Sequence, residues 1–283
     1  AGIFSNKSNL FNIEFIMMFI DILKFYKACD RISEFDQKIS LNDFLIKNKW
    51  SKSFISYHII PMVSAIWSMP PYEAGKMPMN FFLKFFQNHG LFKLRNRPQW
   101  FTVSQRSKTY VNKVLSKISG EYFKNYKIKS VKRISSGVQV YYGGNDEFFE
   151  YDKVVLATHA DETLALIENP TEEETKVLSN FNYRENFAVL HSDEKMMPKN
   201  KKAWSSWNSF VDPKDLNKSS LSYWLNLLEN LKIEENIFLT LNPFREIPEE
   251  KIFKKIKFSH PYFDQKALDN QKNLQKIQNK QNL

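Results

Sequence analysis

The sequence has 283 residues, 42% of them hydrophobic and 25% charged, which is the composition of a globular protein. Its net charge of +10 comes mainly from Lys scattered along the chain, and only seven residues are Arg. Because Arg is the side chain that reads bases and clamps phosphates, we expect no nucleic-acid partner. Attraction to an anionic membrane surface stays open. The single cysteine, Cys29, excludes an internal disulfide and favours a buried thiol in a reducing, cytoplasmic compartment.

Three further features concern the start of the chain and its most apolar stretch. The chain begins with Ala1, and its seven Gly compare with about twenty at average usage. No two of them stand as G-x-G, and the N-terminus lacks the succession of a signal peptide. Residues 11–25 are interrupted by Glu14, Asp21 and Lys24, so they are too short and too charged to span a bilayer. We interpret them as a buried or groove-lining helix.

The first hundred residues have helical spacing and many aromatic side chains. Apolar residues recur at helical intervals over 10–30, and a shorter helix is expected over 40–47. Pro61 and the Pro70-Pro71 pair interrupt the next stretch. Asn80 is the predicted cap of a Phe-rich helix that Gly90 ends.

The pattern changes after Trp100. A helix over 110–118 precedes β-type runs at 126–134, 138–142 and 148–151, with Gly143-Gly144-Asn145 at the second turn. The unbroken apolar run 153–158 predicts a strand buried on both faces. Thr171 opens a capping box for a helix to 181. Strands are predicted at 187–191, 203–210, 222–228 and 237–241, before a polar tail over 264–283. The succession predicts a mixed α/β or α+β fold.

The familiar catalytic signatures are absent. The sequence has no G-x-S-x-G, no P-loop, no H-E-x-x-H and no cysteine pair. Its five histidines, at positions 58, 89, 159, 191 and 260, show no metal-ligand spacing, so no metal is expected and the catalytic residues stay unidentified. A β-meander that feeds a buried strand ending in Ala157-Thr158 is typical of two-domain flavoproteins, because a strand that passes close to a dinucleotide excludes bulky side chains.

Eight segments stand in the order of the motifs of a bacterial family. They are Pro61-Met62-Val63-Ser64-Ala65-Ile66-Trp67-Ser68, Asn88-His89-Gly90-Leu91, Arg97-Pro98-Gln99-Trp100, Val155-Leu156-Ala157-Thr158-His159-Ala160-Asp161, Val189-Leu190-His191-Ser192-Asp193, Ala203-Trp204-Ser205-Ser206-Trp207-Asn208, Leu241-Asn242-Pro243 and Ser259-His260-Pro261. From about residue 10 to residue 275 the chain resembles the predicted NAD/FAD-binding proteins of the flavin-containing amine oxidase superfamily, relatives of monoamine oxidase and phytoene desaturase.

This resemblance implies a two-domain, FAD-dependent amine-oxidase-like fold that is incomplete here. Members of the family begin with G-x-G-x-x-G and end with a further Gly-rich flavin motif, and neither lies in this sequence. The expectation is therefore an internal fragment. Residues 1–103 correspond to the helical part of the substrate domain and 104–168 to the middle of the FAD domain. Residues 169–258 correspond to the β-sheet part of the substrate domain, and 259–283 return towards the FAD domain.

The resemblance also assigns cofactor residues. Val131 stands where relatives contact the adenine side of FAD through backbone atoms, and Ala157, Thr158 and His159 end the strand that passes near the cofactor. Many two-domain flavoproteins have Gly where His159 stands. In 104–107, where relatives often carry Gly-Gly, this chain has Gln105 and Arg106, which puts a close approach of flavin there in doubt.

The aromatic residues Trp67, Trp100, Trp204, Trp207 and Tyr223 are candidates either for the wall of a substrate cavity or for core packing. Arg97, like Arg95, either holds an acidic group or forms surface pairs. The implied reaction is hydride transfer to flavin from a C–H bond of a small-molecule amine or of an apolar, lipid-like substrate. Three alternatives stay open: a colourless, non-catalytic remnant or binding module unable to hold FAD, a basic membrane-surface or nucleic-acid-binding protein, and an NAD-linked parent protein.

Overall fold

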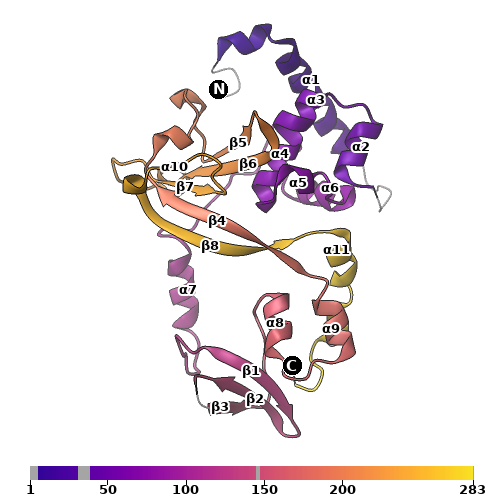
Figure 1. Cartoon of the computed structure of the whole chain (residues 1–283), viewed down its shortest axis with the longest axis vertical. Coiled ribbons are helices and arrows are strands. Elements are labelled where there is room, and N and C mark those ends of the chain that lie inside the picture. Colours follow the sequence, from indigo (N-terminus) through magenta and orange to yellow (C-terminus); the bar gives the residue numbers. More distant parts are fainter. Residues whose placement is uncertain (1–5, 31–38, 145–146, 283) are drawn as a thin grey trace. The chain divides into compact units, whose positions relative to one another are not determined.

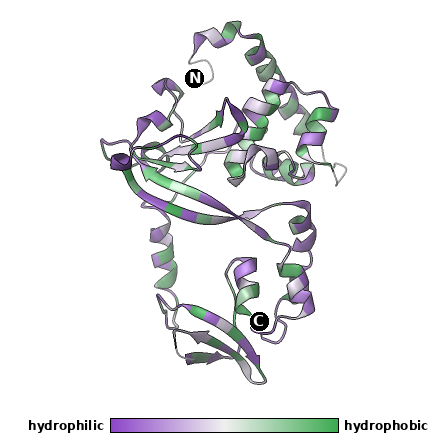
Figure 2. Cartoon of the chain, in the orientation of Figure 1, coloured by the Kyte–Doolittle hydropathy of each residue, from purple (hydrophilic) through white to green (hydrophobic). Residues whose placement is uncertain are grey.

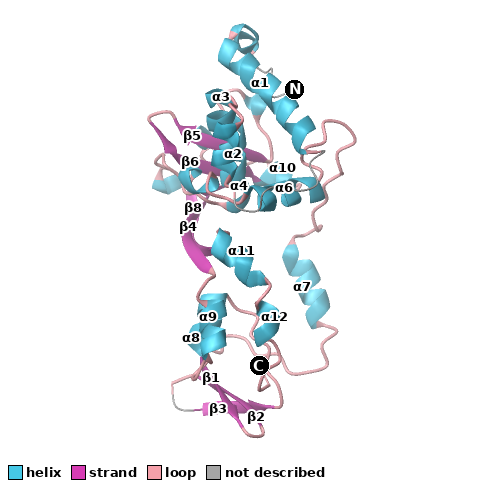
Figure 3. Cartoon of the chain, turned by 90° about the vertical axis from the view of Figure 1, so that its right-hand side faces the viewer, coloured by secondary structure: helices cyan, strands magenta, loops and turns pink. Residues whose placement is uncertain are grey.

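The computed structural model describes residues 6–30, 39–144 and 147–282, and these form helices and two antiparallel sheets (Figures 1 and 3). The chain divides into two compact units. Unit 1 comprises Ala1–Lys113 and Glu185–His260, and unit 2 comprises Val114–Arg184 and Pro261–Leu283. Each unit is therefore built from two separate stretches of chain. The assignment of residues 1–103, 104–168, 169–258 and 259–283 to substrate and FAD domains stays a prediction.

The first stretch of unit 1 is helical. Its elements are η2 Lys7–Phe11, α1 Ile13–Cys29, α2 Leu41–Lys47, α3 Lys52–Phe54, the π-helix η3 Ile55–Ile59, α4 Ile60–Trp67, α5 Pro71–Ala74 and α6 Met79–Asn88. Asn12 caps α1, with its side-chain oxygen accepting from the N–H of Phe15 (3.1 Å), and Ser40 caps α2 in the same way. The predicted helices over 10–30 and 40–47 thus begin where short polar side chains satisfy the first free N–H groups.

Phe25 of α1 is the centre of an aromatic core in unit 1. Its ring lies 5.1 Å from Phe54 and 6.1 Å from Phe82, and all three side chains are completely buried. Cys29, one turn further along the same helix, is also buried, and burial raises the pKa of its thiol to about 12. Burial of the cysteine, predicted from the sequence, is confirmed.

Two expectations about helix ends are wrong. Asn80 is not a cap, because α6 begins at Met79 and Pro78 holds the N-cap position. Pro61 does not interrupt helical structure either, since it lies in the first turn of α4. A proline has no N–H to donate to the preceding turn, which is compatible with the wider π turn just before α4. Gly90, with φ +62°, follows the end of α6 as predicted.

A five-stranded sheet of order β5-β6-β7-β4-β8 lies mainly in the second stretch of unit 1, while β4 begins and β8 ends in unit 2. Its strands are β4 Asn182–His191, β5 Trp207–Asp212, β6 Asp215–Trp224, β7 Phe238–Leu241 and β8 Ile252–Tyr262. The predicted strand 203–210 starts late, because η5 Lys201–Ala203 is a 3-10 turn, and the predicted strand 222–228 stops at Trp224, where α10 Leu225–Leu228 begins. Strand β8 was not predicted. Most of its residues are exposed and three are Lys, so its sequence lacks the apolar pattern from which a strand is predicted.

Unit 2 contains the predicted β-meander, with a register set by short turns. The strands are β1 Ile128–Ile134, β2 Gly137–Tyr142 and β3 Glu147–Tyr151, and Val140 lies opposite both Val131 and Phe149. Gly143 supplies φ +69° after β2, as the turn requires, whereas Asn145 lies outside the described residues. The helices are α7 Ser107–Leu115, which begins within unit 1, α8 Ala160–Leu166, α9 Glu172–Leu178, α11 Gln265–Gln271 and α12 Leu274–Ile277.

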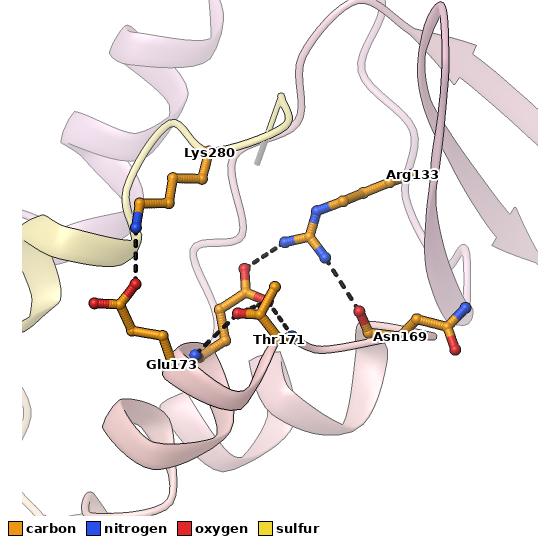
Figure 4. A network of polar contacts seen from close by, with 6 residues as sticks. Arg133, Asn169, Thr171, Glu173 and Lys280 are labelled. Carbon is orange, nitrogen blue, oxygen red and sulfur yellow. Dashed lines mark hydrogen bonds and ion pairs between the residues drawn. The ribbon is translucent and has the colours of Figure 1, made fainter.

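A polar network fastens α9 within unit 2 (Figure 4). Thr171 and Glu174 form the predicted capping box, and the Glu174 carboxylate also bonds the Arg133 guanidinium of β1. Lys280 donates to Glu173 at 2.7 Å, so the end of the chain is tied to the same helix. Beneath α9, Val177 packs in a small buried cluster with Ile277 of α12.

The predicted buried strand at 153–158 is wrong. The segment forms no strand, and Val155 is 90% exposed. The N–H of Val154 donates to the carbonyl of Asn282 (3.0 Å), but no strand of the described residues pairs with this segment. An apolar run is buried on both faces only where strands flank it and helices cover it. Whether strands flank the run and helices cover it depends on the tertiary structure, which the residues of the run alone do not determine.

Candidate functional site

An apolar cavity of about 390 Å³ lies in unit 1. Its lining residues are Tyr57, His58, Pro61, Met62, Ala65, Ile66, Trp207, Ser209, Val211, Pro213, Leu216 and Leu221. None of these described residues is an Asp, Glu, Lys or Arg. We call this cavity the unit 1 pocket.

The wall of the unit 1 pocket comes from one helical segment and two strands. His58, Met62 and Ala65 follow one another at intervals of four and three residues, so η3 and α4 present them on one face. Opposite them, the alternate positions Trp207 and Val211 of β5 point to the same side of the sheet. The two periodicities bring together residues almost 150 positions apart in the sequence.

A neutral hydrogen-bonded pair connects the pocket wall with α1. The Tyr26 hydroxyl lies 3.0 Å from Nε2 of His58 and 3.8 Å from Sδ of Met62. Burial lowers the pKa of His58 to about 4 and raises the pKa of Tyr26 to about 12. Both groups are therefore uncharged at neutral pH, and the polar part of this wall carries no charge.

A second cavity of about 550 Å³ shares Pro61, Val211 and Leu216 with the unit 1 pocket. Its other walls are more polar and include Asp43 and Lys76. The second cavity thus has charged side chains in its wall, whereas the unit 1 pocket, which contains His58 and Trp207, has none.

Two of the predicted substrate-pocket residues lie at the unit 1 pocket. Trp207 lines it, and Tyr223 of β6 packs edge-to-face on Trp207 with ring centroids 5.1 Å apart. Burial raises the pKa of Tyr223 to about 12. Tyr223 therefore holds the indole in place from a neighbouring strand without itself lining the cavity.

The other four candidates lie elsewhere in unit 1. Trp67 packs against Phe85 with the two rings tilted by 58°, and Trp204 donates its indole N–H to the carbonyl of Pro198 (2.7 Å). Trp100 is 65% exposed, and Arg97 is exposed and donates to the carbonyl of Lys93 (2.6 Å). The structure does not bring these four to the lining of the unit 1 pocket, and their functional roles stay predictions.

Most residues of the pocket wall were not predicted from the sequence. His58, Met62, Ala65 and Leu216 were not among the predicted site residues, although 61–68 stood out as a motif. The available signal was the helical spacing of 58, 62 and 65 around that motif.

A buried Ser-Thr-His chain in the sheet of unit 1 is not a nucleophilic site. His191 Nε2 lies 2.7 Å from the Thr240 hydroxyl, which lies 2.7 Å from the Ser222 hydroxyl. The N–H of Asp193 donates to His191 Nδ1 (3.0 Å), so the proton of the neutral ring is on Nε2. Nε2 therefore donates and cannot take a proton from a hydroxyl, and all three side chains are fully buried. In the described residues no group of three His, Cys, Asp or Glu is arranged to hold a metal ion.

The predicted cofactor residues lie in unit 2. Val131 is almost fully buried, and its carbonyl accepts from the N–H of Glu168 (3.0 Å). Ala157 and Thr158 are exposed, so the chain there is open to close approach. The His159 ring stacks on Tyr183 with centroids 4.3 Å apart. Their contact with FAD stays a prediction.

The N-terminus of α8, which follows these residues, does not fit a pyrophosphate. The N–H of His159 donates to the Glu162 carboxylate (3.3 Å), that of Ala160 to the Tyr183 hydroxyl (2.7 Å) and that of Glu162 to Asp161 (2.9 Å). The first turn thus carries two carboxylates, and three of its N–H groups already have partners within the chain, whereas an anion site needs free donors and no negative charge. The N-terminus of α8 therefore provides no cradle for the phosphates of FAD.

The fold is nonetheless found in solved structures, while no protein-family model and no curated protein matches the sequence. The chain resembles a fatty acid isomerase from P. acnes that produces CLA, with a TM-score of 0.62, 12% identity and coverage of 95% of this chain and 69% of that one. It also resembles cyclohexylamine oxidase from Brevibacterium oxydans IH-35A (TM-score 0.55, 12% identity, 92% and 66%) and putrescine oxidase bound to putrescine (0.52, 10%, 89% and 53%). The chain thus spans about two thirds of the first two structures and half of the third.

This likeness confirms the predicted fold class. The chain has the mixed α/β fold of flavin-containing, amine-oxidase-like proteins, which the order of its sequence motifs predicted. At 10–12% identity the likeness defines the fold alone.

Proposed function

We propose that this chain supplies the substrate-binding part of an FAD-dependent, amine-oxidase-like oxidoreductase, and that the unit 1 pocket takes an uncharged, apolar substrate. The observation that carries the substrate class is the wall itself, which consists of apolar and neutral polar side chains. Its volume of about 390 Å³ falls within the range of about 300–1,000 Å³ typical of small-molecule sites.

The wall favours an apolar chain over a charged amine. A buried ammonium ion needs a carboxylate or several oriented acceptors, because desolvation of an unpaired charge is costly. The unit 1 pocket offers no carboxylate, and its histidine is neutral. Among the substrates that the neighbours' names give, a fatty acid's hydrocarbon chain suits this wall better than putrescine.

A second candidate is a binding module that holds an apolar ligand without catalysing its oxidation. One observation favours it, the occupied and acidic N-terminus of α8. Under both candidates the unit 1 pocket binds the same class of ligand. A purified chain with stoichiometric yellow flavin would exclude the second candidate, whereas a colourless chain is compatible with either.

The pocket assignment is tested by introducing a carboxylate into its wall. Leu216→Glu places a charge at a lining position that is already exposed enough to tolerate it, and Leu227→Glu makes the same change on α10, away from the pocket. We expect titration calorimetry with dodecanol to show binding at least tenfold weaker for Leu216→Glu and unchanged binding for Leu227→Glu. Equal affinity of the two variants, or no binding by the unvaried chain, would contradict the assignment.

A further inference from the structure

Helix α1 carries an exposed apolar face at its N-terminal end. Large hydrophobic side chains that are exposed there, together with those of the preceding 3-10 turn, are Leu10, Phe11, Ile13, Ile16, Met17, Ile20 and Leu23. Phe11 is 88% and Ile13 is 74% exposed. Figure 2 shows hydrophobic residues interspersed with hydrophilic ones along α1.

The spacing puts these side chains on one side of the helix. Ile13, Ile16, Met17, Ile20 and Leu23 follow the i, i+3, i+4, i+7 pattern of a single helix face. The buried residues of α1 are Ile22, Phe25, Tyr26 and Cys29, which pack into unit 1 on another side of the helix. The core thus holds α1 through its C-terminal half, and among the described residues the apolar face stays exposed.

Basic side chains flank the apolar face. Lys7 precedes it, and Lys24 and Lys27 follow it at helical positions that continue the same face. The three lysines are exposed. A helix with an apolar face and flanking lysines is typical of segments that lie in the surface plane of a bilayer, where the lysine stems extend to the headgroups.

Two more lysines lie beside α1. The N–H of Ser51 donates to the Asp21 carboxylate (3.0 Å), and Lys49 and Lys52, both exposed, stand close to Ser51 in the sequence. Against these cations α1 carries only Glu14 and Asp21 as acidic residues. The surroundings of the apolar face are therefore positive overall, in a chain of net charge +10.

We propose that α1 binds the surface of an anionic lipid bilayer through this apolar face and its flanking lysines. Anionic lipid supplies the opposite charge, whereas a second copy of this chain would bring the same excess of positive charge. The helix lies on the bilayer and does not cross it, since no helix of the described residues is long and apolar enough to span one. This proposal does not depend on the oxidoreductase function.

The test is co-sedimentation of the full chain with vesicles of phosphatidylglycerol or of phosphatidylcholine. We expect binding to phosphatidylglycerol that salt weakens, and much less binding to phosphatidylcholine. The variant Ile13→Asn/Met17→Asn/Ile20→Asn should bind at least a hundredfold more weakly. Its matched control, Leu227→Asn/Ile233→Asn/Phe253→Asn, changes three other exposed apolar residues of unit 1 and should bind like the unvaried chain.

A second variant isolates the charge. Lys24→Gln/Lys27→Gln removes two cations from exposed positions and should weaken binding to phosphatidylglycerol about thirtyfold, from the usual contribution of each lysine near an anionic surface. Equal sedimentation of the unvaried chain and the α1 apolar variant would overturn the proposal, as would no sedimentation of the unvaried chain. A dimer detected by light scattering that the apolar variant abolishes, without vesicle binding, would overturn it in favour of a second copy.

Discussion

Two histidines, the fully buried His191 and the partly buried His58, are uncharged in the folded chain because burial disfavours the imidazolium ion. The pKa of both His58 and His191 is lowered from 6.5 to about 4. The unfolded chain therefore takes up protons below pH 6.5 that the folded chain does not. The stability that each contributes is fully present above pH 6.5 and is lost as the pH falls towards 4, by about 3 kcal/mol for a shift of this size.

The first prediction concerns His58. In His58→Gln the side chain can still form a hydrogen bond with Tyr26 but does not titrate, so the free energy of unfolding should fall less between pH 6.5 and pH 4 than in the unvaried chain. Urea unfolding at several pH values measures this fall. The control is Leu227→Gln, which introduces the same side chain at an exposed position of α10 without removing a titratable group and should leave the fall unaltered. A fall as steep in His58→Gln as in the unvaried chain would show that His58 does not cause it.

The second prediction compares a buried with an exposed ion pair in unit 2. The side chains of Arg133 and Glu174 are 14% and 6% exposed, and those of Lys132 and Glu168 are 45% and 41% exposed. Arg133→Met leaves a buried carboxylate without its cation and should cost about 3–5 kcal/mol of unfolding free energy. Lys132→Met should cost less than about 1 kcal/mol. Similar losses in the two variants, measured by urea unfolding, would contradict the assignment of the buried pair.

Residue type alone did not determine which aromatic side chains line the pocket. Trp207 and Trp100 are both exposed, and both were predicted from the sequence as candidates for the wall of a substrate cavity. Of these two, Trp207 alone lines the unit 1 pocket. The difference lies in register, because β5 points Trp207 and Val211 to one side of its sheet. Burial of Cys29 could be predicted, since a lone cysteine on an apolar helix is most often a small buried hydrophobe.

At the scale of elements, local signals predicted helices well and strands less well. Ser40 and Thr171 cap α2 and α9 through bonds to residues three positions away, so their chemistry is visible in the sequence. Strand formation depends on partners far along the chain. For that reason 153–158 has the pattern of a buried strand but pairs with no strand in the described part of the chain, and the Lys-rich β8 pairs although its sequence has no apolar pattern.

The third prediction concerns the turn that opens β2. A Cβ on Gly137 would collide with the backbone carbonyl of Tyr151 on β3, whereas a Cβ on Gly120 would meet no atom within 4 Å. Gly137→Ala should therefore destabilise the meander by about 2 kcal/mol or more, because the backbone must shift to make room. Gly120→Ala should stay within about 0.5 kcal/mol of the unvaried chain. Amide exchange of Val131 and Val140 measures the effect, and unchanged protection in Gly137→Ala would contradict the close approach of β2 to β3 at this turn.

For the whole molecule, the order of motifs predicted the fold class but not the site. Eight short segments that follow one another in the order of the family's motifs indicated an amine-oxidase-like fold, and the solved structures share that fold. The unit 1 pocket, in contrast, joins residues 57–66 with 207–221 across α4, β5 and β6. Neither the composition of its wall nor the neutrality of His58 follows from the sequence, because both depend on which side chains the tertiary fold brings together.

The most direct test of the proposed substrate class is titration calorimetry of the full chain at neutral pH with dodecanol and with dodecylamine. The two ligands have the same hydrocarbon chain and differ in the charge of the head group. A pocket with no charged lining residue and a neutral histidine should bind dodecanol at least tenfold more tightly than the protonated amine. Binding of dodecylamine as tight as, or tighter than, that of dodecanol would contradict an uncharged apolar substrate.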